Sequence, residues 1–280
     1  MIPGARVTAG AIGSVIDLRT PRTGRVHSVF THAVNLELGD QMWTVVAHGG
    51  HDAAFTLRLS GVVVPGHLGL RIHDPVCVRS SHVRAGPAVI DARTAVRWMP
   101  QRYDVDLDEL GERVAELEAA ARRVAWAGSW PLAGAVAGAL ASACPTDLDE
   151  AVRRAIGRGP GLTPAGDDVL VGILAVLTAP AGAPGAGGAR EPAAARLRAA
   201  LTPALPATTE ISRALLSQAS RGHLSRPVWE LTSAVLSGRV PSAQARADVL
   251  STGATSGGDT CAGLVAACRL LSRSLEGITA

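Results

Sequence analysis

The sequence predicts an α+β protein. A mostly antiparallel β region, barrel-like or sandwich-like, is followed by a mainly helical region with two glycine-rich turns that open buried helices. Short apolar runs separated by Gly, Pro, Asp and His fill the N-terminal third, without a long helical pattern among them. From Val105 onward the apolar residues recur at helical spacing. Because the two parts differ in this way, we predict a β-rich region at 1–104 and a helical region at 105–280.

Four runs in the N-terminal part have the composition of β-strands, and turn residues separate them. They are Val34–Leu38, Met42–Val46, Phe55–Leu59 and Val76–Arg79. Gly39 and Asp40 lie between the first two runs, so we predict a β-hairpin there.

The C-terminal part begins with a charged amphipathic pattern over Leu107–Ala125, which predicts a surface helix. Further helices are predicted at Leu132–Ala143, Asp147–Ile156, Val169–Leu177, Pro192–Leu201, Glu210–Ser220, Pro227–Leu236, Ala243–Leu250 and Thr260–Leu275. The Ala/Gly/Pro-rich segment Ala179–Gly188 is predicted to be a surface loop.

Composition excludes several classes of function. The chain has 280 residues and a formal net charge of +3, so no strongly basic nucleic-acid-binding face is expected. All 27 Lys and Arg residues are arginines, which excludes lysine Schiff bases and a Walker A phosphate loop. No apolar run is long enough to cross a membrane and no signal-peptide pattern is present, so we expect a cytoplasmic protein without membrane association. The four cysteines have no C-x-x-C spacing, so no structural zinc site is predicted.

The strongest motif is the run Gly157–Asp168, which ends in two carboxylates and leads into an apolar helix. A second run, Gly253–Asp259, has the same form, G-x-T-x-x-G-D. Glycine-rich helix N-termini present free backbone N–H groups and the positive end of the helix dipole, which together bind anions. We therefore predict that the two turns share one site for a small anionic substrate. The predicted substrate-binding residues are Asn35, Gly159, Gly161, Thr163, Gly166, Asp168, Thr255, Ser256, Gly257, Gly258 and Arg213.

The carboxylates at the turns have two interpretations. Asp167 and Asp259 are the candidate catalytic residues, which would orient an amide of the substrate or hold Mg²⁺ against a phosphate. Helix capping alone explains an acid in the first turn equally well, and for Asp168 the structural interpretation is favoured. Thr163, Thr255 and Ser256 are predicted N-caps. No metal site is predicted from the chain alone, and no cofactor is predicted beyond Mg²⁺ as an open alternative.

Other polar residues carry weaker signals. Asn35 interrupts an apolar strand, which indicates a buried hydrogen-bonding role, structural or ligand-binding. Arg158 and Arg213 are candidates for anion recognition, because arginine is the only cationic side chain besides histidine. The cluster His48–Asp52 lacks a diagnostic metal spacing and is interpreted as a polar turn. His223 follows a predicted helix and could cap its C-terminal carbonyls.

The motifs together resemble one family. Gly157–Asp168, Thr208–Leu231 with Ser212, Gly222 and Trp229, the turn Thr255–Asp259 and the strand around Asn35 are similar to the AllH family. The resemblance implies a subunit of an oxamate carbamoyltransferase, which acts with two other subunits on oxamate and carbamoyl phosphate in anaerobic allantoin breakdown. Other subunits of a hetero-oligomeric enzyme are therefore expected as partners.

Two hypotheses remain open from the sequence. In the first, the chain is a carbamoyl- or acyl-transferase subunit, and the two turns bind an anion such as carbamoyl phosphate. In the second, the chain is a non-catalytic scaffold or small-ligand-binding subunit, and the glycines only allow close helix packing. The absence of a recognisable base–nucleophile pair favours the second hypothesis.

Overall fold

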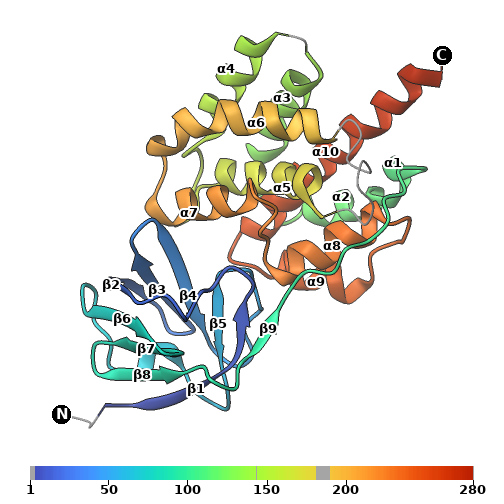
Figure 1. Cartoon of the computed structure of the whole chain (residues 1–280). Coiled ribbons are helices and arrows are strands. Elements are labelled where there is room, and N and C mark those ends of the chain that lie inside the picture. Colours follow the sequence, from blue (N-terminus) through green and yellow to red (C-terminus); the bar gives the residue numbers. More distant parts are fainter. Residues whose placement is uncertain (1–3, 143, 181–189, 280) are drawn as a thin grey trace. The chain divides into compact units, whose positions relative to one another are not determined.

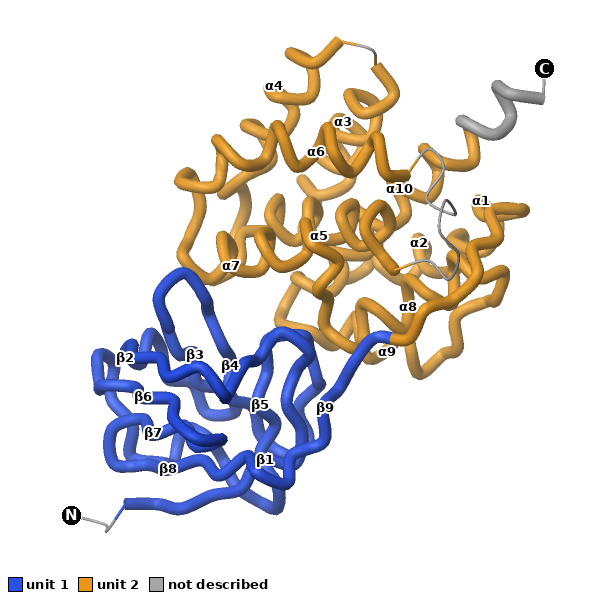
Figure 2. The backbone as a smooth tube through the Cα atoms, in the orientation of Figure 1, with its two compact units in different colours: residues 1–100 blue, residues 101–280 orange. Residues whose placement is uncertain are grey.

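The computed structural model describes residues 4–142, 144–180 and 190–279, with side chains described as far as Arg273. The chain forms two compact units, residues 1–100 and residues 101–280 (Figure 2). Most of the predicted Ala179–Gly188 loop lies outside the described residues.

The N-terminal unit is an eight-stranded mixed β-barrel (Figure 1). Its strands are β1 (Arg6–Gly13), β2 (Arg22–Val29), β3 (Ala33–Leu38), β4 (Gln41–Val46), β5 (Thr56–Leu59), β6 (Pro75–Arg79), β7 (His82–Ala85) and β8 (Ala88–Asp91). The order β5-β4-β3-β2-β6-β7-β8-β1 closes because β1 also pairs with β5. The strand β9 (Val96–Trp98) extends the sheet parallel to β1, and the 3₁₀ helix η1 (Pro65–His67) follows β5.

Most neighbouring strands in the barrel are antiparallel, as predicted, but β1 runs parallel to β8 and β4 runs parallel to β5. The predicted hairpin is confirmed, since Leu38 pairs with Gln41 across Gly39, whose φ is +68°. A left-handed backbone of this kind favours glycine. Inward-facing Val, Leu and Ile side chains fill the barrel, together with the fully buried Trp43.

The C-terminal unit is helical, as predicted. Its helices are α1 (Leu110–Arg113), α2 (Ala115–Ala121), α3 (Ser129–Ala141), α4 (Pro145–Ala155), α5 (Ala165–Thr178), α6 (Arg190–Ala204), α7 (Glu210–Ala219), α8 (Arg226–Leu236), α9 (Ala243–Leu250) and α10 (Ser256–Thr279), with the 3₁₀ helix η2 (Leu205–Ala207) after α6. None of the helices in the described part of the chain has the length and apolar character needed to span a bilayer.

The single helix predicted at 107–125 is wrong, because the chain forms two short helices there. The chain before α1 is fixed to α8: the Asp106 N–H donates to Leu236 O, and Arg113 donates to the carbonyls of Asp106 and Val235. Glu109 consequently has a φ of +50° and cannot continue a helix. The apolar stripe is nevertheless buried as its spacing predicts, at Leu110, Val114, Leu117 and Ala121.

The helix α5 is the centre of this unit and is buried on nearly every side, as its continuous apolar run predicts. It packs most extensively on α10. Glycines allow the two backbones to approach: a Cβ added at Gly172 of α5 would lie 1.9 Å from Thr260 O. Reciprocally, a Cβ added at Gly263 of α10 would lie 2.0 Å from Val169 O. The crossing therefore tolerates no side chain at either position.

We predict that Gly172→Ala and Gly263→Ala each lower the free energy of unfolding by about 2–4 kcal/mol, because a methyl group must separate two buried helices. Denaturant unfolding measures the change. Gly134→Ala in α3 is the matched control, since a Cβ there meets nothing within 4 Å. The control should stabilise by roughly 0.5–1 kcal/mol through helix propensity alone. Equal effects at all three glycines would contradict the packing argument.

Candidate functional site

The first glycine-rich turn connects α4 to α5 and has an unusual backbone. Gly157, Gly159 and Gly161 have φ values of +69°, +95° and +107°, which side chains rarely adopt. The Gly166 N–H donates to Arg158 O at 2.8 Å and closes the turn. A Cβ at Gly166 would lie 1.9 Å from Ala155 O, so this glycine also allows α5 to begin directly against the end of α4.

The second turn connects α9 to α10 and is packed as tightly. Gly253 has a φ of +62°. A Cβ at Gly257 would lie 2.0 Å from Val249 O, and a Cβ at Gly258 would lie 2.5 Å from the backbone nitrogen of Ala125. The glycines of both motifs are therefore explained by backbone geometry and close packing, whatever else they do.

The two turns meet, as the repeated motif predicts. The Thr163 and Ser256 hydroxyl oxygens lie 3.1 Å apart, although the residues are 93 positions apart in the chain. Both side chains are half-buried, while Leu162 and Ala254 beside them are exposed. The junction of the two helix N-termini is thus at the surface of the C-terminal unit, where a solute can reach it.

The predicted N-cap at Thr163 is wrong. The N-cap of α5 is Pro164, and no side chain caps the helix. The Thr163 hydroxyl instead donates to Asp168 Oδ2 at 3.1 Å. The predicted N-cap at Ser256 is also wrong, because Ser256 is the first residue of α10. Thr255, directly before it, occupies the N-cap position.

Asp168 is the acid at this junction, and it is 7% exposed. Burial raises the pKa of Asp168 to about 8; the Ser256 and Thr163 hydroxyls oppose the shift, and the nearby Asp259 and Asp167 add to it. At neutral pH the carboxyl is therefore mostly protonated, and it can donate a hydrogen bond. A neutral Asp168 adds no negative charge at the positive end of the α5 dipole.

Asp167 is 1% exposed and serves the turn itself. Its Oδ1 accepts the Gly157 N–H at 2.8 Å, and its Oδ2 accepts the Thr208 hydroxyl. Burial raises its pKa, while these bonds and the nearby Ser212 hydroxyl oppose the rise. Ser212 lies close enough to have this effect, although its hydroxyl does not reach hydrogen-bonding geometry.

Asp259 occupies the corresponding position in the second turn and is fully buried. Its Oδ1 accepts the Trp126 N–H at 2.8 Å and the Ser129 hydroxyl at 2.6 Å. Its Oδ2 is buried and has no hydrogen-bond partner among the described residues. Each motif acid thus binds one backbone N–H and one hydroxyl, but only Asp259 keeps an oxygen without a partner.

The hydroxyl and backbone partners of these acids, Thr208, Ser129 and Trp126, were not among the sequence candidates. Thr208 precedes α7, whose N-cap is Thr209. Trp126 lies between α2 and α3, and Ser129 is the first residue of α3. Ser129 and Trp126 are 130 and 133 positions from Asp259, so only the fold shows that they meet it.

The remaining candidates do not converge on the junction through any described hydrogen bond or ion pair. Arg213 is exposed, and its Nη2 lies 3.5 Å from Thr208 O. Arg158 is exposed in the first turn. Asn35 belongs to the barrel, where its Nδ2 donates to Ser28 Oγ at 2.9 Å and its Oδ1 accepts from Thr44 Oγ1 at 2.8 Å.

The histidine-containing segments supply no metal centre within the described residues. No group of three or more His, Cys, Asp or Glu side chains there is arranged to hold a metal ion. Asp52 of the predicted polar turn pairs with Arg58 at 2.8 Å. His223 follows α7, where its Nδ1 lies 2.9 Å from Gln218 Oε1, and burial followed by the charge of Arg221 lowers its pKa.

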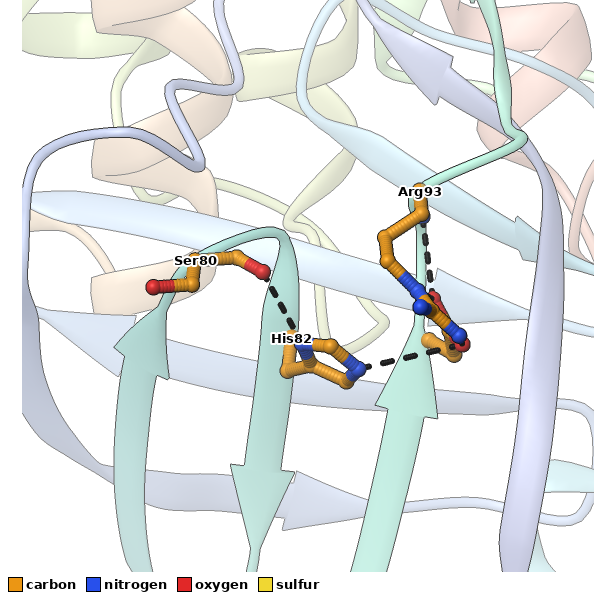
Figure 3. Close-up of polar contacts among 4 residues, drawn as sticks. Ser80, His82 and Arg93 are labelled. Atoms are coloured by element: carbon orange, nitrogen blue, oxygen red, sulfur yellow. Dashed lines mark hydrogen bonds and ion pairs between the residues drawn. The ribbon is translucent and has the colours of Figure 1, made fainter.

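A serine, a histidine and an aspartate also lie together on the barrel (Figure 3). His82 Nδ1 lies 2.9 Å from the backbone oxygen of Ser80, not its hydroxyl, and His82 Nε2 lies 3.7 Å from Asp91 Oδ2. Arg93 binds Asp91 with its side chain, and its hydrogen bonds lower the pKa of Asp91. Because no hydroxyl faces the imidazole in this cluster, it lacks the geometry of a nucleophilic triad.

We predict that Asp259→Ala lowers the free energy of unfolding by about 2–4 kcal/mol, since two buried donors lose their acceptor. Asp259→Asn should stay within about 1 kcal/mol of the wild type, because the amide oxygen can keep both bonds. Asp149→Ala, at an exposed position of α4, is the control and should change stability by less than about 0.5 kcal/mol. If Asn were as damaging as Ala, the negative charge itself would hold the turn.

A second prediction concerns pH. The pKa of Asp168 in the folded chain lies above its unfolded value of 3.8, so its contribution to stability is lost as pH rises from about 4 to about 8. Asp168→Asn removes this loss and should raise the melting temperature relative to wild type at pH 9, with a difference that shrinks towards pH 4. Thermal unfolding of the wild type and of Asp168→Asn between about pH 4 and pH 9 measures this difference in melting temperature. A difference that does not change with pH would contradict the raised pKa.

Two family models match the chain, one in each of its two compact units. Residues 8–97 match the family model described as the AllH family N-terminal domain, which covers the barrel. Residues 155–268 match the family model described as oxamate carbamoyltransferase subunit AllH, which contains both glycine-rich turns. Searches of curated proteins and of solved structures found no match. The two matched segments together cover most of the chain, and the protein belongs to the AllH family.

Proposed function

We propose that this protein is a subunit of a carbamoyltransferase-type enzyme and that the junction of its two glycine-rich turns binds a small anionic substrate such as carbamoyl phosphate. The observation that carries the proposal is the contact between the Thr163 and Ser256 hydroxyls, which brings two helix N-termini to one accessible point. The name of the matched family supplies the reaction class and indicates further subunits as partners.

The groups at the junction suit an anion. Two helix N-termini supply backbone N–H groups and partial positive charge, and the Ser256 hydroxyl is an additional donor. Asp168 in its protonated form adds a donor without the repulsion of a carboxylate. The exposed Arg158 in the first turn can supply the cation, in a chain without lysine. Such donors would stabilise charge on phosphate as it leaves a carbamoyl group.

We propose different functional roles for Asp167 and Asp259. The contacts of Asp167 favour a positioning role, because both of its oxygens hold the turn in place. Asp259 keeps one oxygen without a described partner, so it is the better candidate to orient a substrate amide. Mg²⁺ would enter this site only with a phosphate ligand, since it accepts one or two carboxylates together with phosphate oxygens.

The second candidate function is a non-catalytic scaffold. It is favoured by the close packing of the motif glycines and by the bonds that hold both motif acids. Asp259→Asn separates the two functions in the assembled enzyme. If the variant loses turnover but keeps wild-type stability, Asp259 acts in a substrate site. If turnover is unchanged, the scaffold function is favoured.

Binding is tested by titration calorimetry with carbamoyl phosphate and with inorganic phosphate, with and without Mg²⁺, on the chain alone and assembled with its partner subunits. Ser256→Ala should weaken binding by roughly 5–10-fold through the loss of one hydrogen bond. Affinity should also fall above about pH 8, where Asp168 ionises and repels the anion, and Asp168→Asn should abolish that fall.

Ser251→Ala is the control for this titration, since Ser251 is exposed and its hydroxyl donates to the Asp248 carbonyl, outside the junction. The control should bind like wild type. The proposal fails if no heat of binding appears with the assembled subunits, or if Ser256→Ala binds as tightly as wild type.

A further inference from the structure

A groove lies between α3 and α10, and it shares no lining residue with the junction described above. Its volume is about 410 Å³. Small residues of α3 and apolar residues of α10 line its floor, while Arg122, Arg269 and Arg273 contribute cationic side chains. A volume of this size falls within the roughly 300–1,000 Å³ range of small-molecule sites.

No described residue packs against the two glycines in the groove. Gly134 and Gly138 lie in the interior of α3, where each costs roughly 0.5–1 kcal/mol relative to alanine. A Cβ at either position would meet nothing within 4 Å, and both residues are exposed. At the glycines of the two turns and of the helix crossing, by contrast, an added Cβ would meet other atoms of the chain within 4 Å. Open glycines on a groove floor allow close approach by an occupant from outside the chain.

The charge of the groove favours an anionic occupant. Glu118 is the described acid that binds these arginines; it pairs with Arg122 at 2.6 Å and also binds Arg269. Among the described side chains, three arginines and one glutamate give an excess of positive charge beside the apolar floor. The Arg122 guanidinium also lies 4.2 Å from the centroid of the Trp130 ring, which lines the same groove. Arginine beside apolar surface suits a carboxylate, sulfonate or phosphate attached to an apolar body.

We propose that the groove between α3 and α10 is a binding site for an organic anion with a narrow apolar body. The apolar part would lie along the small-residue face of α3 around Gly134 and Gly138, and the anionic group would face the arginines. This proposal is independent of the proposed transferase site, because the two sites share no residue.

The probe for the test is 8-anilinonaphthalene-1-sulfonate, an aromatic sulfonate, compared with its uncharged relative N-phenyl-1-naphthylamine. Fluorescence titration of the intact chain should give saturable binding of the sulfonate and at least about tenfold weaker binding of the neutral compound. Gly138→Leu fills the groove but improves helix propensity, so the variant should keep or raise the melting temperature while binding falls by at least about tenfold.

Three variants complete the design. Gly138→Ala has the improved propensity without the bulk and should bind within about threefold of wild type. Arg273→Gln should weaken sulfonate binding by about five- to tenfold and leave the neutral probe unaffected. Arg221→Gln, at an exposed position outside the groove, should change the binding of neither the sulfonate nor the neutral probe.

The proposal is overturned if Gly138→Leu binds the sulfonate like wild type, or if the neutral probe binds equally well and Arg273→Gln has no effect. Sedimentation of wild type and Gly138→Leu adds a separate readout. If the substitution dissociates an assembly, the groove is a protein interface, and the small-molecule proposal is likewise overturned.

Discussion

The close crossing of α5 and α10 is the constraint on which the candidate site depends. Gly172 and Gly263 each lie against the backbone of the other helix, and a side chain at either position would separate them. Because helices are stiff over a few turns, the crossing distance also sets the separation of their N-termini. Thr163 and Ser256 meet at 3.1 Å as a consequence. The glycines that look like ligand-binding residues in the sequence therefore act first as packing residues, and any binding capacity follows from that packing.

The same packing determines the electrostatics of the junction. Burying three aspartates near one another in the first turns of two helices is unfavourable unless each is bonded or neutral. Asp167 and Asp259 are each held by a backbone N–H and a hydroxyl, whereas Asp168 has two hydroxyl neighbours and the pKa raised to about 8. Asp167 and Asp259 thus hold the two turns through their hydrogen bonds, and Asp168 can exchange a proton near neutral pH. The sequence favoured a structural role for Asp168, but burial raises its pKa to about 8.

Much of the fold could be predicted from the sequence, because periodicity reports which face of an element is buried. The two-part α+β architecture, the hairpin at Gly39 and the buried helix α5 followed from local pattern. The strands β1 and β2 gave weaker signals, since they contain glycine and several polar residues. The start of α1 as late as Leu110 could not be predicted, because the chain before α1 is fixed by hydrogen bonds to α8, more than a hundred residues away.

For the candidate site, the repeated motif was sufficient to predict that the turns meet, but not what each residue does there. The hydrogen-bond partners of the motif acids come from distant parts of the chain, as in the contact between Ser129 and Asp259, which are 130 positions apart. A glycine motif alone cannot distinguish a packing role from a binding role. The distinction requires the space around each glycine: Gly172 and Gly263 face backbone, whereas Gly134 and Gly138 face solvent. Helix-interior glycine is costly in both cases, and the occupied space accounts for the first pair. At the second pair no described residue meets an added Cβ, and this difference is what the proposed groove site would explain.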